Sequence, residues 1–171
     1  MALPIIKFLE DMREAVANFK AIHEAIVEYF SLKNQMLLEL SSNWTSGTKT
    51  VTDISKYETI EVFPYDTFGG IICRLEPDDY FRGSGFVQGV STAFVHFEFS
   101  FTVSGDALTV KTCRYGGRSG TTIWTPETAM VRRIRGVEPK LPDALKNILG
   151  GGYYIDSLLY FLERRCKRVC S

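Results

Sequence analysis

The sequence predicts an α+β protein made of an N-terminal coiled-coil helix, an antiparallel β-sandwich and short C-terminal helices. Two observations carry this prediction. The first forty residues repeat apolar side chains with a heptad spacing, and the following stretch alternates apolar and polar residues between Gly- and Pro-containing turns. We therefore expect an oligomerising helix over 1–42, a β-sandwich domain over 43–137 and a helical extension over 138–171.

The helix prediction rests on a segment without Gly or Pro between Ile5 and Ser46. Apolar residues recur there at seven-residue spacing in three columns, interrupted by Lys33 and His23: Ile5, Met12, Phe19, Ile26, Leu40; Phe8, Ala15, Ile22, Tyr29, Met36; and Leu9, Val16, Phe30, Leu37. A sustained heptad indicates a coiled coil, and three columns make a stripe wider than a dimer seam, which favours a trimer. The expected interface residues are Met12, Phe19, Ile22, Ile26, Tyr29 and Met36. The alternative is a helix that packs only on its own domain.

The clearest strand runs from Val95 to Val103, where alternate residues share a face. Its apolar face is Val95, Phe97, Phe99, Phe101 and Val103, and its polar face is His96, Glu98, Ser100 and Thr102. A turn at Ser104-Gly105-Asp106 predicts a hairpin that returns through Leu108–Val110. Further strands are expected at Lys49–Ile54, Thr59–Tyr65, Gly70–Leu75 and Ala129–Ile134, with turns at Gly69-Gly70, Pro77-Asp78-Asp79, Gly83-Ser84-Gly85 and Gly116-Gly117. Short strands at this spacing are typical of a sandwich or barrel.

The C-terminal extension is predicted to be helical in two pieces. Pro142 stands where a first helical residue is favoured, ahead of Asp143–Leu149, and Gly150-Gly151-Gly152 ends that helix. A second helix is expected from Tyr153 to Val169, and its role stays open.

Charge and composition exclude several classes of protein. Lys+Arg and Asp+Glu both total 20, so the formal net charge is zero, which argues against non-specific nucleic-acid binding. No stretch approaches the roughly 18 apolar residues of a membrane-spanning helix, and the N-terminus lacks the pattern of a signal peptide. We therefore expect assembly in a reducing cytoplasm and free thiols at Cys73, Cys113, Cys166 and Cys170, with Cys73 and Cys113 packed as small hydrophobic side chains.

The middle of the chain resembles a β domain that recurs in prophage tail-fibre and receptor-binding proteins. The likeness is carried, in order, by Trp44–Val51 with Ile54–Tyr57, Tyr80–Gly85, Phe101–Thr109 and Val131–Val137. It implies a β-sandwich displayed by an oligomeric stalk on a phage tail. The chain departs from the family in that residues continue after Val137, where such domains tend to end, so the tail tip, the baseplate and the capsid surface are alternative positions in the virion.

Catalytic patterns are weak, and we expect no enzyme activity, no cofactor and no metal. Of the two histidines, His23 lies on the apolar stripe and His96 on the polar face of a strand, and neither has a nucleophile beside it in the sequence. Asp78-Asp79 is expected to form a turn rather than a pair of catalytic acids. Gly83-Ser84-Gly85 lacks the residues of a phosphate-binding loop.

The segment 113–124 has the composition most typical of a ligand-binding loop. Its glycines predict a loop, and its ligand-binding candidates are Arg114, Tyr115, Arg118 and Trp124. The alternative is a mobile connection with Trp124 in the core. The leading hypothesis is a homotrimeric phage tail-fibre or receptor-binding component that contacts other virion proteins and a host surface glycan or protein. The alternatives are a capsid decoration or head-fibre protein and a virion-associated glycan-degrading enzyme.

Overall fold

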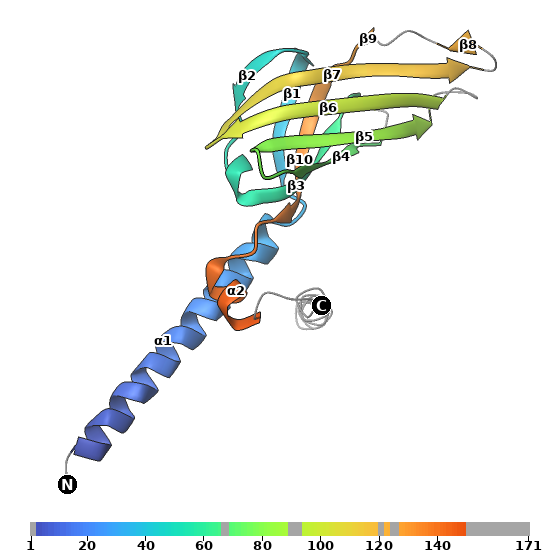
Figure 1. Ribbon diagram of the computed structural model, residues 1–171. Coiled ribbons are helices and arrows are strands. Elements are labelled where there is room, and N and C mark those ends of the chain that lie inside the picture. The colour runs from blue at the N-terminus through green and yellow to red at the C-terminus, as the bar shows by residue number, and fades with distance from the viewer. Residues whose placement is uncertain (1–2, 66–68, 89–93, 120–121, 124–126, 150–171) are drawn as a thin grey trace. The chain divides into compact units, whose positions relative to one another are not determined.

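The computed structural model describes residues 3–65, 69–88, 94–119, 122–123 and 127–149. They form an α+β protein with an N-terminal helix and a curled antiparallel β-sheet (Figure 1). Two compact units divide the chain. One contains the helix as far as Phe30 together with the chain from Leu141 onward, and the other is Ser31–Lys140, which contains the whole sheet.

Helix α1 runs from Leu3 to Leu32. Asn34 adopts a left-handed conformation with φ of 62°, which ends the helix, and strand β1 begins at Met36. The carbonyl of Leu32 accepts a hydrogen bond from the Tyr57 hydroxyl at 2.7 Å, and the Gln35 carbonyl accepts one from the Gly136 N–H at 2.8 Å. The last carbonyl of the helix, that of Leu32, is therefore satisfied by a side chain of β3.

The prediction that the helix continues to Leu40 is wrong. Residues Met36–Trp44 form β1, which pairs with β10 and carries a bulge between Met36 and Leu38. Leu37, Leu38 and Leu40 pack against the core of the sheet. Leucine occurs in helices and in strands, so the heptad spacing of these residues does not by itself specify a helix. Here the burial that the leucines gain when β1 pairs with β10 favours a strand.

The remaining strands are β2 (Gly47–Thr50), β3 (Tyr57–Phe63), β4 (Ile71–Leu75), β5 (Tyr80–Gln88), β6 (Phe94–Ser104), β7 (Ala107–Ser119), β8 (Thr122–Ile123), β9 (Glu127–Thr128) and β10 (Val131–Pro139), and a 3-10 turn covers Ile54–Lys56. All pairs are antiparallel, in the order β1-β10-β3-β4-β5-β6-β7-β2, and β8 and β9 also pair with β7. The strands at the two ends of this order are joined only by Thr45 and Ser46. So short a link requires the sheet to curl until its two edges approach.

Trp44 stands at this link and is buried. Its indole N–H donates to the Ser46 carbonyl at 2.9 Å, and its ring lies 5.9 Å from that of Phe101. Trp44 therefore packs in the core at the closing link. One continuous sheet encloses one apolar core, so the predicted antiparallel β-fold is present as a single curled sheet.

Strand β6 supplies the centre of that core. Phe97, Phe99 and Phe101 are fully buried, and their rings stack with centroids 6.1 Å apart along the strand. Val95 is buried too, and Val103 packs against the cluster. The predicted strand, its apolar face and the hairpin return are confirmed. Positive φ occurs at Gly105 in the two-residue turn, which favours glycine there.

The predicted turn at Gly83-Ser84-Gly85 is wrong because this triplet lies inside β5. Gly83 and Gly85 pair with Phe99 and Phe97, so the two glycines face the core opposite the largest rings of β6. A side chain at Gly83 would overlap the Ile72 carbonyl and the Cys73 sulfur. Glycine therefore allows β4 to fold closely over β5, and the curl of the sheet depends on it.

Other predictions were met in part. The strand expected at Lys49–Ile54 is shorter, since β2 ends at Thr50 and the 3-10 turn begins at Ile54. The turn at Pro77-Asp78-Asp79 is confirmed by the left-handed φ of Asp79 (58°). Helix α2 spans Asp143–Leu149 as predicted, and the second helix expected at Tyr153–Val169 lies outside the described residues, as do Cys166 and Cys170.

The two faces of β6 predict unequal responses to truncation. Phe99 is 1% exposed, so Phe99→Ala should lower the free energy of unfolding by about 3–5 kcal/mol through lost burial and an unfilled cavity. Glu98→Ala, on the outer face, should cost less than about 1 kcal/mol. Chemical denaturation of both variants measures this, and equal losses would contradict the assigned faces.

Candidate functional site

The outer face of β5, β6 and β7 carries the candidate site. Because alternate residues of a strand point to opposite faces, the residues between the buried phenylalanines of β6 point outward. Strand pairing aligns these outward residues in rows across the three strands: Tyr80, Thr102 and Thr109; Arg82, Ser100 and Thr112; Ser84, Glu98 and Arg114; and Phe86, His96 and Gly116. The face therefore presents hydroxyl, carboxylate, guanidinium and aromatic groups together.

An open groove of about 450 Å³ lies on this face. Its lining includes Arg82 and Ser84 from β5, His96, Glu98 and Ser100 from β6, and Thr112 from β7. Pockets of this size accommodate small ligands, and a few polar groups in them determine orientation. The paired strands beneath the groove bring these groups together on one face.

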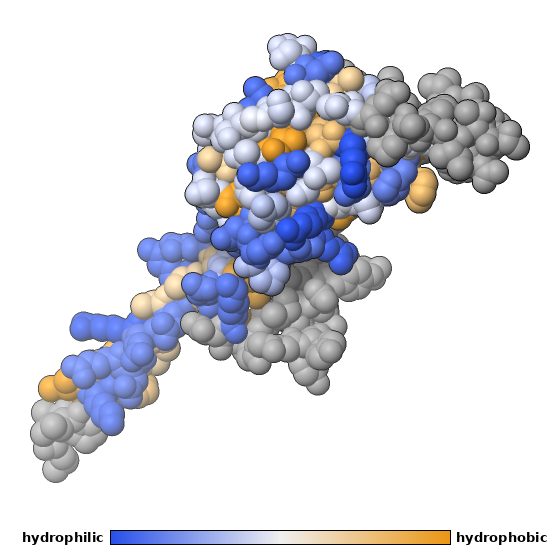
Figure 2. All heavy atoms as spheres, turned by 45° about the horizontal axis from the view of Figure 1, so that its top comes forward, coloured by the Kyte–Doolittle hydropathy of each residue, from blue (hydrophilic) through white to orange (hydrophobic). Residues whose placement is uncertain are grey.

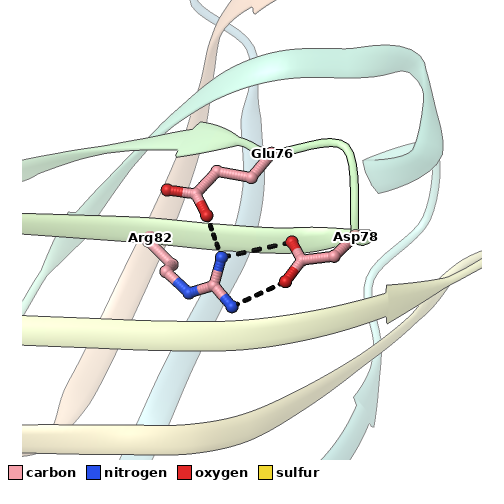
Figure 3. Close-up of polar contacts among 3 residues, drawn as sticks. All are labelled: Glu76, Asp78 and Arg82. Carbon is pink, nitrogen blue, oxygen red and sulfur yellow. Dashed lines mark hydrogen bonds and ion pairs between the residues drawn. The ribbon is translucent and has the colours of Figure 1, made fainter.

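Arg82, which lines the groove, is held by two carboxylates (Figure 3). Its guanidinium forms a double hydrogen bond with the Asp78 carboxylate, at 2.8 and 3.1 Å, and also pairs with Glu76. The same guanidinium lies 4.3 Å from the centre of the Tyr80 ring. Contacts with Asp78, Glu76 and Tyr80 hold the guanidinium plane in one orientation. The N–H groups that these ion pairs do not use therefore point in a fixed direction.

Glu98 and Arg114 form a second ion pair across β6 and β7. The Arg114 Nε and Nη2 atoms approach one carboxylate oxygen of Glu98 at 2.8 and 2.7 Å. Both side chains are partly exposed, so the pair contributes little to stability. Its effect is to orient the carboxylate while leaving a second oxygen as an acceptor.

An exposed aromatic side chain lies beside the groove. Phe86 is 73% exposed, and its ring centre is 4.8 Å from that of His96, which lines the groove. The side chains of Phe86 and His96 lie opposite each other in paired strands. Large apolar side chains in this setting supply contact area for a partner.

The predicted loop at 113–124 is wrong for most of its length, because β7 extends to Ser119 and β8 follows at Thr122. Gly116 and Gly117 are strand residues paired with His96 and Val95, so no turn forms there. Long antiparallel pairing with β6 overrides the turn preference of the two glycines.

The four candidate residues of that segment do not form one cluster. Arg114 lies on the outer face with Glu98, whereas the Tyr115 ring stacks on Phe97 at 5.8 Å on the core side. The backbone of Arg118 pairs with Phe94 and Ile123, its side chain lies outside what the structure describes, and Trp124 lies outside the described residues.

Sequence reasoning identified the polar face of β6 but did not assign it a function. It missed Arg82, Ser84 and Phe86 because Gly83-Ser84-Gly85 was interpreted as a turn. The available signal was the alternation from Tyr80 to Val87, in which Phe81, Gly83, Gly85 and Val87 share one face.

The cysteines in the described part of the chain are buried thiols. Cys73 and Cys113 are free and buried in the core, as predicted. Burial raises the pKa of the Cys113 thiol from 9.0 to about 12 and raises the pKa of Cys73 as well. Both thiols are therefore protonated near neutral pH and are poor nucleophiles or metal ligands. Within the described ranges, no three His, Cys, Asp or Glu side chains gather as a metal site.

Helix α1 presents a second candidate surface. Its first part exposes large apolar side chains at the predicted heptad positions, including Ile5 (64% exposed), Met12 and Phe19 (74% exposed). Figure 2 shows such hydrophobic side chains at the surface of the helix beside hydrophilic ones. Charged residues lie outside the columns, for example the Lys20–Glu24 pair. None of the helices in the described ranges is both long and apolar enough to cross a membrane.

Five of the six predicted interface residues lie on α1, and they fall into three groups of exposure. Met12 and Phe19 are exposed, Ile22 and Ile26 are half-buried, and Tyr29 is already buried within its own chain. Met36 lies in β1 and not on the helix, so its assignment to the helical stripe is wrong. The exposed columns end before Tyr29.

Comparison with known proteins returned no matching family model, no matching curated protein and no matching solved structure.

Proposed function

We propose that this chain is a structural protein of a bacteriophage virion, a tail-fibre or receptor-binding component that attaches the particle to the host cell surface. One observation carries the proposal. The sheet buries its own apolar side chains, whereas the adjoining helix leaves its heptad columns exposed. The helix is therefore suited to assembly with other copies of the chain, and the sheet is suited to presenting a binding surface.

The exposed columns favour self-association of α1. Burial of one large apolar side chain stabilises an assembly by about 1.5–3 kcal/mol, and several such side chains on each helix are available. Columns in a strict heptad direct helices into a coiled coil, and a stripe wider than two columns favours three helices. We therefore propose a parallel homotrimer held by residues 5–26, and a sandwich-like sheet domain carried by each chain.

Trimeric display suits attachment to a repetitive surface. Three linked copies of a weak site bind a surface with high avidity, because the second and third contacts form within an already tethered complex. The resemblance of Trp44–Val137 to tail-fibre and receptor-binding β domains supports the same function. We propose other virion proteins and a host surface glycan or protein as partners, no nucleic acid and no cofactor, and a structural rather than enzymatic role.

The proposed trimer is tested by placing a charge in an exposed column. Phe19→Asp would bury a carboxylate in each of three helices, so the protein should become monomeric. Lys20→Asp is the matched control because Lys20 is exposed and lies outside the three columns, and it should leave the trimer intact. Light scattering after size-exclusion chromatography gives the masses. A monomeric wild-type protein, or a trimeric Phe19→Asp variant, would contradict the assembly.

The virion location is tested by labelling. Gold-conjugated antibody against this chain should decorate the tails of particles produced by the host strain that carries the gene, in electron micrographs. Gold confined to the heads would replace the tail-fibre proposal with a capsid decoration or head-fibre protein. Particles without label would exclude a virion protein.

A further inference from the structure

We propose that the groove on the outer face of β5–β7 binds a neutral saccharide, with Phe86 as the stacking platform. This inference rests on the proposed function and deepens it, because it assigns the attachment site to one surface and one chemical class of ligand. The groove lies entirely within the sheet unit and is defined by paired strands.

Phe86 provides the contact for an apolar sugar face. A side chain at 73% exposure contributes almost nothing to the core, and the Phe86 ring contacts only one neighbouring ring in the described residues, that of His96, at 4.8 Å between centres. The C–H groups on one face of a pyranose pack on an aromatic face in the same way as other apolar groups do. The ring therefore offers a flat apolar surface adjacent to polar groups.

The polar lining matches sugar hydroxyls, which both donate and accept hydrogen bonds. Glu98 accepts, Arg82 donates, and the hydroxyls of Ser84, Ser100 and Thr112 do either. These groups come from three neighbouring strands, so a ring placed across the groove meets donors and acceptors on several sides. Because ion pairs already orient Arg82 and Glu98, a ligand need not order them.

Charge decides in favour of a neutral ligand. Both guanidinium groups at the groove are paired with carboxylates, Arg82 with Glu76 and Asp78, and Arg114 with Glu98. The two guanidinium groups and the three carboxylates together carry a net charge of −1. An anionic sugar would therefore compete with existing partners in a slightly negative field, whereas a neutral sugar leaves them undisturbed.

The experiment uses the full chain on an array of neutral gluco-, galacto-, manno- and rhamno-oligosaccharides beside acidic hyaluronan fragments and sialyllactose. Wild-type protein should bind at least one neutral series more strongly than either acidic probe. Phe86→Ala should weaken that binding by about tenfold, and Phe86→Trp should retain it. Ser100→Tyr, which fills the groove floor, should abolish it.

Met36→Ala is the control, since it removes another exposed apolar side chain from β1, outside the groove, and it should bind as wild type does. Thermal midpoints of Phe86→Ala and wild type should agree, because Phe86 is exposed. Neutral-sugar binding that survives both Phe86→Ala and Ser100→Tyr would overturn the groove assignment, as would preference for the acidic probes or absence of binding to every probe.

Adherence of the same proteins to host cells separates the two proposals. Wild-type adherence that Phe86→Ala and Ser100→Tyr leave unchanged would overturn the groove and leave attachment standing. Wild-type sugar binding without adherence would support the groove and contradict host attachment.

Discussion

The buried Phe97–Phe99–Phe101 column of β6 is the feature on which the rest of the sheet depends. The rings stack on one another and on Tyr115 of β7, Phe101 also contacts the tilted ring of Trp44 at the closing link, and glycines of β5 face the column. Since alternate residues of a strand point to opposite faces, burial of these rings forces His96, Glu98 and Ser100 outward. The same alternation along β6 therefore determines both which residues form the core and which residues line the candidate site.

The two units of the chain differ in how completely they bury their own apolar surface. The sheet unit encloses an almost continuous cluster from Trp44 to Ile134. The helix exposes most of its large apolar residues from Ile5 to Phe19, although Ala25 and Tyr29 are buried. A helix of this kind is marginal alone, because most helical stability in proteins comes from packing an apolar face. We propose that other copies of the chain complete that face.

Sequence reasoning succeeded where the residues fit only one pattern of secondary structure. The strict alternation of β6 defined its faces, and Pro142 marked the start of α2. It failed where the same residues fit both a helical and a strand pattern. It also failed where pairing between strands overrides the turn preference of glycine. Leu37 and Leu40 continue the heptad yet belong to a strand, and Gly83, Gly85, Gly116 and Gly117 are turn residues by composition yet lie in paired strands. The candidate groove was missed for the same reason, because half of its lining comes from β5 and β7.

Hydrogen–deuterium exchange on the intact protein at two concentrations tests most directly whether the sheet completes its own core and the helix does not. The amides of β6 and β7 should exchange slowly at both concentrations, since their pairing and burial lie within one chain. The amides of α1 between Ile5 and Ile26 should be protected at high concentration and lose that protection on dilution. Rapid exchange along α1 at every concentration, or protection that dilution leaves unchanged down to a verified monomer, would contradict the account.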